Sequence, residues 1–214
     1  LIYFTFDFYK PNISYNFKIT SRVKFFFKKL LPSIFSSGVT QINILVGTII
    51  ASFQPGAVSF LYYADRVYQI NLAIAGIAVG TVSLPVLSKA LKLKNFSKVS
   101  NIQNRSIQLS LLLSIPASLG LIIASEEIVN GLFGYGTFTL KDVEKTSDAL
   151  MFFGYGVIAF ALVKILSNFF FARDNTKTPF YISTFIVVLN VVISLSLFEE
   201  IGFLIIPIAT SIST

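Results

Sequence analysis

The sequence predicts an all-α fold, a polytopic bundle of transmembrane helices, from three observations. The chain is 54% hydrophobic and 13% charged, with a mean hydropathy of +0.77, whereas about a quarter of the residues of a soluble domain are charged. Its long apolar runs, each about 20 residues, are long enough to cross a hydrocarbon core of roughly 30 Å. These runs are apolar on all sides, unlike the striped helices of soluble proteins. The short segments between them alternate in charge sign.

Five full spans and a truncated sixth follow from the positions of these runs. Pro32 and Pro179 lie near the starts of two spans, where a missing N–H costs least. Pro85, Pro116 and Pro207 lie inside spans and predict kinks. The expected spans are about 33–53, 61–88, 106–125, 148–172, 178–198 and, cut off by the end of the sequence, 201–214.

The charges between the runs predict which side of the membrane each loop occupies. Lys and Arg are enriched in cytoplasmic loops. Alternate loops hold thirteen basic residues on one side and only Lys141 and Lys145 on the other. Loops 9–32, 89–105 and 173–177 are therefore predicted to be cytoplasmic. The thirteen residues are Lys10, Lys18, Arg22, Lys24, Lys28, Lys29, Lys89, Lys92, Lys94, Lys98, Arg105, Arg173 and Lys177.

The segments outside the full spans complete the predicted organisation. Residues 1–8 are expected to end a preceding transmembrane helix, and the chain to be an internal piece of a longer protein. Residues 9–32 form a basic cytoplasmic loop in which Ile19–Leu31 is expected to be an interfacial helix, with aromatic and basic residues suited to an anionic leaflet. Residues 33–214 form the bundle. Gly131–Thr139 is expected to be an outer loop or a re-entrant turn.

Composition also excludes several kinds of function. The chain has no Cys and no His, so disulfides, thiolate or imidazole metal sites, and Ser-His or Cys-His catalysis are excluded. The net charge of +7 lies in short loops beside apolar spans, which argues against nucleic acid as a partner. No cofactor is expected. A membrane-embedded enzyme acting on lipid phosphates remains an alternative, although no cluster of intramembrane acids supports it.

Three ionisable residues inside the spans are the candidate functional residues. Asp65 and Arg66 lie one or two turns from the outer end of their span. Lys164 lies nine residues before Arg173, or about 13 Å from the cytoplasmic end. A charge near the bilayer centre costs about 2.5–3.5 kcal/mol and persists mainly beside a wet cavity or a partner. A polar cavity for an anionic substrate is one interpretation; side chains that extend to the membrane interface are the other.

Further polar and small residues lie on the spans. Gln41 and Asn43 are candidate ligands, although such residues more often form hydrogen bonds between helices. Gly76 and Gly80, four residues apart, form a small face that allows another helix to approach closely.

The segment Ser37–Leu91 resembles the MurJ/MviN family, the bacterial lipid II flippases of the multidrug/oligosaccharidyl-lipid/polysaccharide (MOP) superfamily. Similar blocks occur at Phe169–Pro179 and Ala209–Ser213. The motifs that carry the resemblance are Gln41-Ile42-Asn43, Ala51-Ser52-Phe53, Tyr62-Tyr63-Ala64-Asp65-Arg66, Gly76-Ile77-Ala78-Val79-Gly80-Thr81 and Leu84-Pro85.

The resemblance implies half of a two-lobe inner-membrane transporter that flips lipid II by alternating access, and not an enzyme. Its partners would be lipid II, membrane lipids and a missing N-terminal lobe. Arg66 would contact the lipid II pyrophosphate, Asp65 would support Arg66, and Lys164 matches a basic position of some members. Export of a drug or of another polyprenyl-linked saccharide is the alternative within the superfamily.

One departure from the family pattern concerns sodium. Some members have an acidic residue or Asn where this chain has Gly47, and the partner position is Ser194, although Asn190 and Thr210 match. Hard cations prefer carboxylate oxygens, so no metal site is predicted.

Overall fold

The computed structural model describes residues 20–214, without the side chains of residues 22, 28, 29 and 31–40. The expected preceding span 1–8 and the basic residues Lys10 and Lys18 lie outside the described residues. The chain divides into two compact units, Leu1–Leu31 and Pro32–Thr214.

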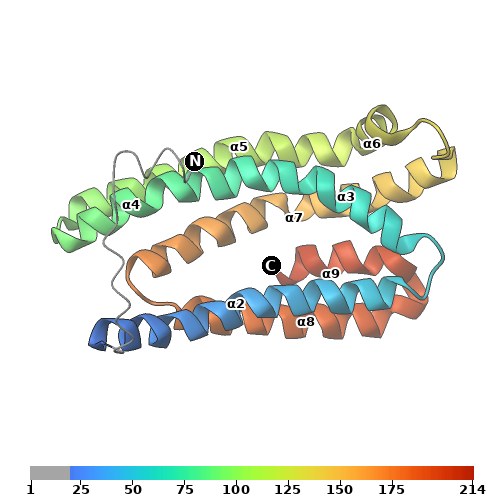
Figure 1. Ribbon diagram of the computed structural model, residues 1–214. Coiled ribbons are helices and arrows are strands. Elements are labelled where there is room, and N and C mark those ends of the chain that lie inside the picture. Colours follow the sequence, from blue (N-terminus) through green and yellow to red (C-terminus); the bar gives the residue numbers. More distant parts are fainter. Residues whose placement is uncertain (1–19) are drawn as a thin grey trace, which may run out of the picture. The chain divides into compact units, whose positions relative to one another are not determined.

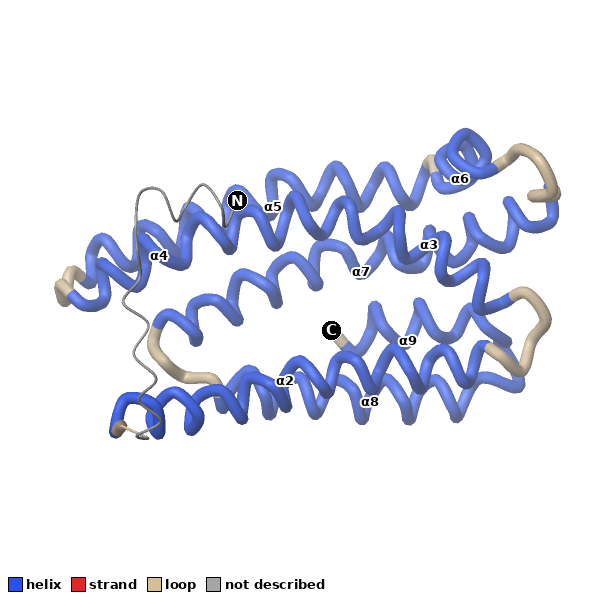
Figure 2. Tube along the Cα trace, in the orientation of Figure 1, coloured by secondary structure: helices blue, strands red, loops and turns tan. Residues whose placement is uncertain are grey.

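Helices make up all the regular structure of residues 20–214, which confirms the predicted all-α fold (Figures 1 and 2). By length and composition, four of the described helical segments could cross a membrane: Ala57–Lys92, Phe96–Ile123, Leu140–Ala172 and Lys177–Ser213. The helices are α2 (Ser21–Ala51), α3 (Ala57–Leu72), α4 (Val79–Lys92), α5 (Phe96–Ile123), α6 (Ser125–Phe133), α7 (Leu140–Ala172), α8 (Lys177–Ile201) and α9 (Ile205–Ser213), with the π-helix η1 (Ala73–Ala78) and the 3-10 helix η2 (Gly202–Leu204).

Several boundaries differ from the sequence expectations. Within the expected interfacial segment, residues 21–31 form the first part of α2, and the boundary between the two units falls inside α2. The segment expected to lie outside contains the helix α6, which was not predicted and which includes the start of Gly131–Thr139. α7 begins at Leu140 because Thr139 and Asp142 form a reciprocal capping box.

Helix α7 is the centre of the second unit. It packs against α3, η1, α4, α5, α6 and α9, and Leu150, Val157, Ala161 and Ile165 on it are completely buried. The Tyr68 ring of α3 stacks on the Phe153 ring, with 5.1 Å between the centroids. Because α7 contacts nearly every other helix of the unit, these contacts fix its position along the bundle axis. That position sets the depth at which the polar side chains of α7 lie.

A row of buried serines lies along α5, and one of them bonds to α7. The row has the four-residue spacing of one helix face, so all its members point the same way. Ser118 Oγ donates a hydrogen bond of 2.8 Å to the Gly154 carbonyl oxygen of α7. The serines, Ser106, Ser110, Ser114 and Ser118, are all buried. Small side chains let the two helices approach closely.

The small-residue face predicted at Gly76 and Gly80 is confirmed. A Cβ atom added at Gly76 would lie 3.2 Å from Ala161 Cα and 3.4 Å from Lys164 Cβ of α7. A Cβ atom added at Gly80 would collide with the Asn168 Nδ2 atom of α7. At Gly76 the obstacle is backbone, which cannot rotate away, so this glycine fixes how closely η1 and α7 pack.

We therefore expect Gly76→Val to destabilise the bundle. Overpacking a tight contact costs about 1–3 kcal/mol, which should appear as a lower midpoint of thermal unfolding in detergent. The matched control is Gly120→Val on α5, because a Cβ atom there meets nothing within 4 Å. Equal unfolding midpoints for the two variants would show that the close approach at Gly76 does not limit packing.

The chain reverses between α8 and α9 at Gly202, which has a φ of 73°, a conformation that favours glycine. The Gln54 side chain, which follows α2, stabilises this turn: its Oε1 atom accepts a 2.8 Å hydrogen bond from the Phe203 N–H. α9 then packs along α8, and the visible reversal (Figure 1) divides the apolar segment Lys177–Ser213 into two helices.

Candidate functional site

The candidate site begins on α3, where Asp65 and Arg66 follow one another. The Arg66 side chain is exposed, and its guanidinium Cζ lies 4.6 Å from the centroid of the Tyr62 ring. Asp65 is half-buried and accepts a hydrogen bond from the Gln69 side chain. Tyr62 precedes Arg66 by four residues and Gln69 follows Asp65 by four, so one helix orients both charged groups.

This arrangement leaves the Arg66 guanidinium able to bind an anion. Its ring partner covers one face of the guanidinium by a cation–π contact, while the N–H edges form no hydrogen bond with the described part of the chain. Asp65 is bonded to Gln69 rather than to Arg66. A planar guanidinium with free edges suits bidentate binding of phosphate oxygens.

Lys164 lies at a different depth from Arg66. It is exposed on α7, and the neighbouring contact at Gly76 places its Cβ beside η1. Gly76 lies ten residues after Arg66 along α3 and η1, or about 15 Å at 1.5 Å per residue. The structure therefore brings the two cations to adjacent helices but does not place them in direct contact.

The two predicted site residues of α2, Gln41 and Asn43, have no described contact with Asp65 or Arg66. Gln41 is exposed, and Asn43 is half-buried, with its Oδ1 atom buried and without a hydrogen-bond partner among the described residues. None of the described contacts connects either of them to Arg66 or Lys164.

The residues around Gly47 do not fit a carboxylate-bound cation. Gly47 supplies no side-chain oxygen, and a Cβ atom there would lie 3.5 Å from the Ile206 Cγ2 methyl of α9. Asn190 on α8 instead donates a 3.0 Å hydrogen bond to Thr210 Oγ1 of α9, and Ser194 is buried. These contacts join helices, so no metal enters the mechanism below.

Sequence reasoning missed the residues that orient the charged pair. Tyr62 and Gln69 lie four residues from Arg66 and Asp65, and this helical spacing was available in the sequence as a signal. Asn168 of α7 belongs to no site predicted from the sequence. Its contact with Gly80 depends on the register of α3–α4 against α7, which the sequence does not reveal.

Comparison with protein families gives a match over nearly the whole chain. Residues 2–214 match the family described as "Lipid II flippase MurJ". A "probable lipid II flippase MurJ" of Rhizobium meliloti is 42% identical over 185 residues, which is 86% of this chain and 35% of the relative. A protein of the same name from Rickettsia prowazekii is 41% identical over 190 residues, 87% of this chain and 38% of the relative.

Solved structures match the fold as well. The chain is similar to "Lipid II flippase MurJ, inward closed conformation", with a TM-score of 0.79 and 29% identity over 99% of this chain and 45% of that structure. An outward-facing multidrug resistance MATE transporter of the MOP superfamily has a TM-score of 0.72 over 86% of this chain and 40% of its own, at 17% identity, which shows a shared fold alone. The chain thus spans little more than a third of the length of these curated relatives.

Proposed function

The chain belongs to the lipid II flippase MurJ family and is a multi-pass protein of the bacterial inner membrane, and from this premise we propose that the protein carrying it moves lipid II from the inner to the outer leaflet. Such transport supplies peptidoglycan synthesis and so serves cell-wall biogenesis and cell shape. It moves a lipid without making or breaking covalent bonds, so the protein would not be an enzyme.

The observation that supports this proposal most strongly is the exposed guanidinium of Arg66 on a membrane helix. A charge at such a depth is costly unless it faces a polar cavity or an anionic ligand. The substrate headgroup offers a diphosphate, and the free N–H edges of Arg66 match two of its oxygens. The Asp65 carboxylate accepts a hydrogen bond from Gln69 and not from Arg66. Asp65 would therefore support Arg66 through its nearby negative charge.

Lys164 would serve a second part of the same headgroup. It lies about 15 Å further along the helix axis, a distance that a disaccharide-peptide headgroup is long enough to span. Gln41 and Asn43 would add hydrogen bonds to sugar or peptide groups. The exposed Gln41 side chain supports this role, because its amide can both donate and accept hydrogen bonds.

Alternating access then requires a second bundle facing this one. The curated relatives are much longer than this chain, and we propose that the remainder supplies the opposing wall of the cavity. Rocking of the two bundles around the bound headgroup would carry it across the membrane.

Complementation tests this function. In cells depleted of their own lipid II flippase, the full-length protein containing this segment should restore growth, and lipid II on the inner leaflet should fall to the level of undepleted cells. Growth without a fall in inner-leaflet lipid II would indicate another polyprenyl-linked cargo. Turnover of lipid phosphate by the purified protein would indicate an enzyme instead.

A further inference from the structure

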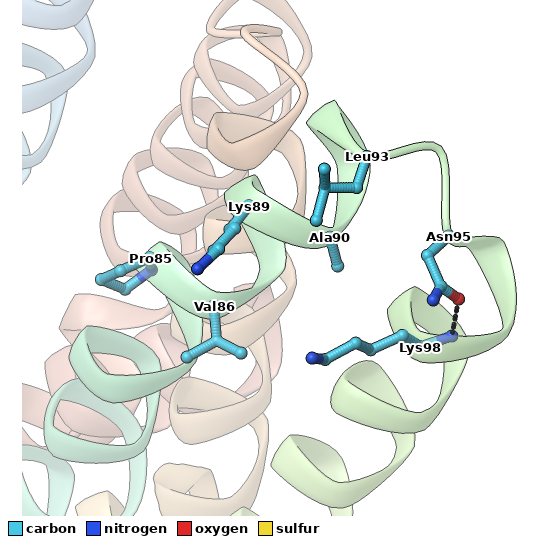
Figure 3. A pocket seen from close by; sticks show the side chains of 7 residues that line it. All are labelled: Pro85, Val86, Lys89, Ala90, Leu93, Asn95 and Lys98. Atoms are coloured by element: carbon cyan, nitrogen blue, oxygen red, sulfur yellow. Dashed lines mark hydrogen bonds between the residues drawn. The ribbon is translucent and has the colours of Figure 1, made fainter.

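A cavity of about 410 Å³ lies between the end of α4 and the start of α5. It is separate from the proposed headgroup site. Its apolar wall contains Pro85, Val86 and Leu93, and its polar wall contains Lys89, Asn95 and Lys98 (Figure 3). None of the five candidate residues of the headgroup site lines it.

The turn between the two helices positions the polar wall. Lys94 has a φ of 52°, and Asn95 caps α5 by accepting a 3.0 Å hydrogen bond from the Lys98 N–H with its Oδ1 atom. The cap fixes the amide and leaves its Nδ2 group able to donate to a ligand. Figure 3 shows the Lys98 side chain extending from α5 toward α4, while Lys89 lies along α4 near Pro85 and Val86.

The charge around the cavity has a single sign. Residues 89–105 contain basic residues and no acid, so no carboxylate of this segment neutralises Lys89 or Lys98. Such a loop attracts anions, and this one lies on the side that the positive-inside rule assigns to the cytoplasm.

The apolar wall distinguishes this cavity from a simple basic loop. Leu93 is 69% exposed and Val86 45% exposed, and both line the same cavity as Lys89 and Lys98. Exposed aliphatic side chains and cations in one cavity, at the end of a membrane helix, match a ligand with an anionic head and a hydrocarbon tail. A soluble phosphate would use the lysines but gain nothing from the apolar residues.

We propose that this cavity binds one acidic phospholipid of the cytoplasmic leaflet. Its phosphate lies between the Lys89 and Lys98 ammonium groups and accepts a hydrogen bond from Asn95 Nδ2. The first part of an acyl chain packs on Pro85, Val86 and Leu93. The bound lipid links α4 to α5 at their cytoplasmic ends, and this role does not depend on which substrate the protein transports.

The test measures lipid binding to the full-length protein in detergent by native mass spectrometry, with dioctanoyl phosphatidylglycerol as the probe. Each lysine near anionic lipid contributes enough attraction that the variant Lys89→Gln/Lys98→Gln should weaken binding about tenfold or more. The matched control, Lys92→Gln/Lys94→Gln, removes the same charge from the same loop but leaves the cavity lining intact, and should change the dissociation constant by less than about threefold.

Two further probes identify the ligand class. Dioctanoyl phosphatidylcholine has the same acyl chains without net charge and should bind more weakly than phosphatidylglycerol. Inorganic phosphate should neither bind comparably nor displace the lipid at equal concentration. Equal losses in the two double variants would overturn the proposal in favour of a diffuse basic surface, and equally tight binding of inorganic phosphate would overturn the assignment to a lipid.

Discussion

Replacing Arg66 by alanine is expected to abolish rescue of flippase-depleted cells by the full-length protein. The variant removes the guanidinium whose free edges would bind the diphosphate, while the Tyr62 ring that now covers one face stays in place. Hydrogen bonds between charged groups contribute about 1.5–3 kcal/mol each, so losing two should reduce transport at least about a hundredfold. Growth after depletion and the amount of inner-leaflet lipid II measure the result.

Two further variants distinguish the role of the guanidinium geometry at Arg66 from the effect of losing a positive charge. Arg66→Lys keeps the positive charge but loses the planar fork, so we expect partial rescue at best. Arg105→Ala removes an exposed Arg outside the proposed site and should rescue normally at equal protein abundance. Normal rescue by Arg66→Ala would remove Arg66 from the mechanism and, with it, the main support for a diphosphate-binding site.

The sequence predicted the broad fold well because hydrophobic length and loop charge are local signals. Each apolar run overlaps observed helices over most of its length, although the runs 33–53 and 106–125 extend past the ends of α2 and α5. The glycines at 76 and 80 face α7 as small residues at a helix contact should. Helix ends were less predictable. The expected span ends at residue 198, yet α8 continues through Glu199 and Glu200 to Ile201, and the chain turns at Gly202, where a positive φ is available.

The site was predictable only as a list of residues. The cost of placing a charge inside a membrane span singles out Arg66 and Lys164 from the sequence alone. The distance between the two residues, however, depends on the register between α7 and η1. That register is set by the contact of Gly76 with Ala161, which joins positions 85 residues apart. The helix α6 was missed for a different reason, since its two acidic residues resembled those of an outer loop although they stabilise a helix N-terminus.

Replacing Lys164 by alanine is expected to impair transport strongly without destabilising the protein. The Cβ atom that packs beside Gly76 is retained in alanine, so the contact between η1 and α7 survives. Removing a charge from near the bilayer centre also removes a cost of about 2.5–3.5 kcal/mol. We therefore expect an unfolding midpoint equal to or above that of the parent protein, together with a loss of about tenfold or more in transport.

The opposite changes in stability and transport are what distinguish a functional lysine from one that merely extends to the membrane interface. Lys164→Arg keeps a cation at this depth and should retain most transport, whereas Lys164→Glu should abolish it because a carboxylate repels the anionic headgroup. Lys177→Ala, at the exposed start of α8, is the control for loss of one positive charge and should rescue normally. If Lys164→Ala rescued as well as Lys177→Ala, the headgroup would not extend from Arg66 to η1, and the cation at Lys164 would have no part in binding it.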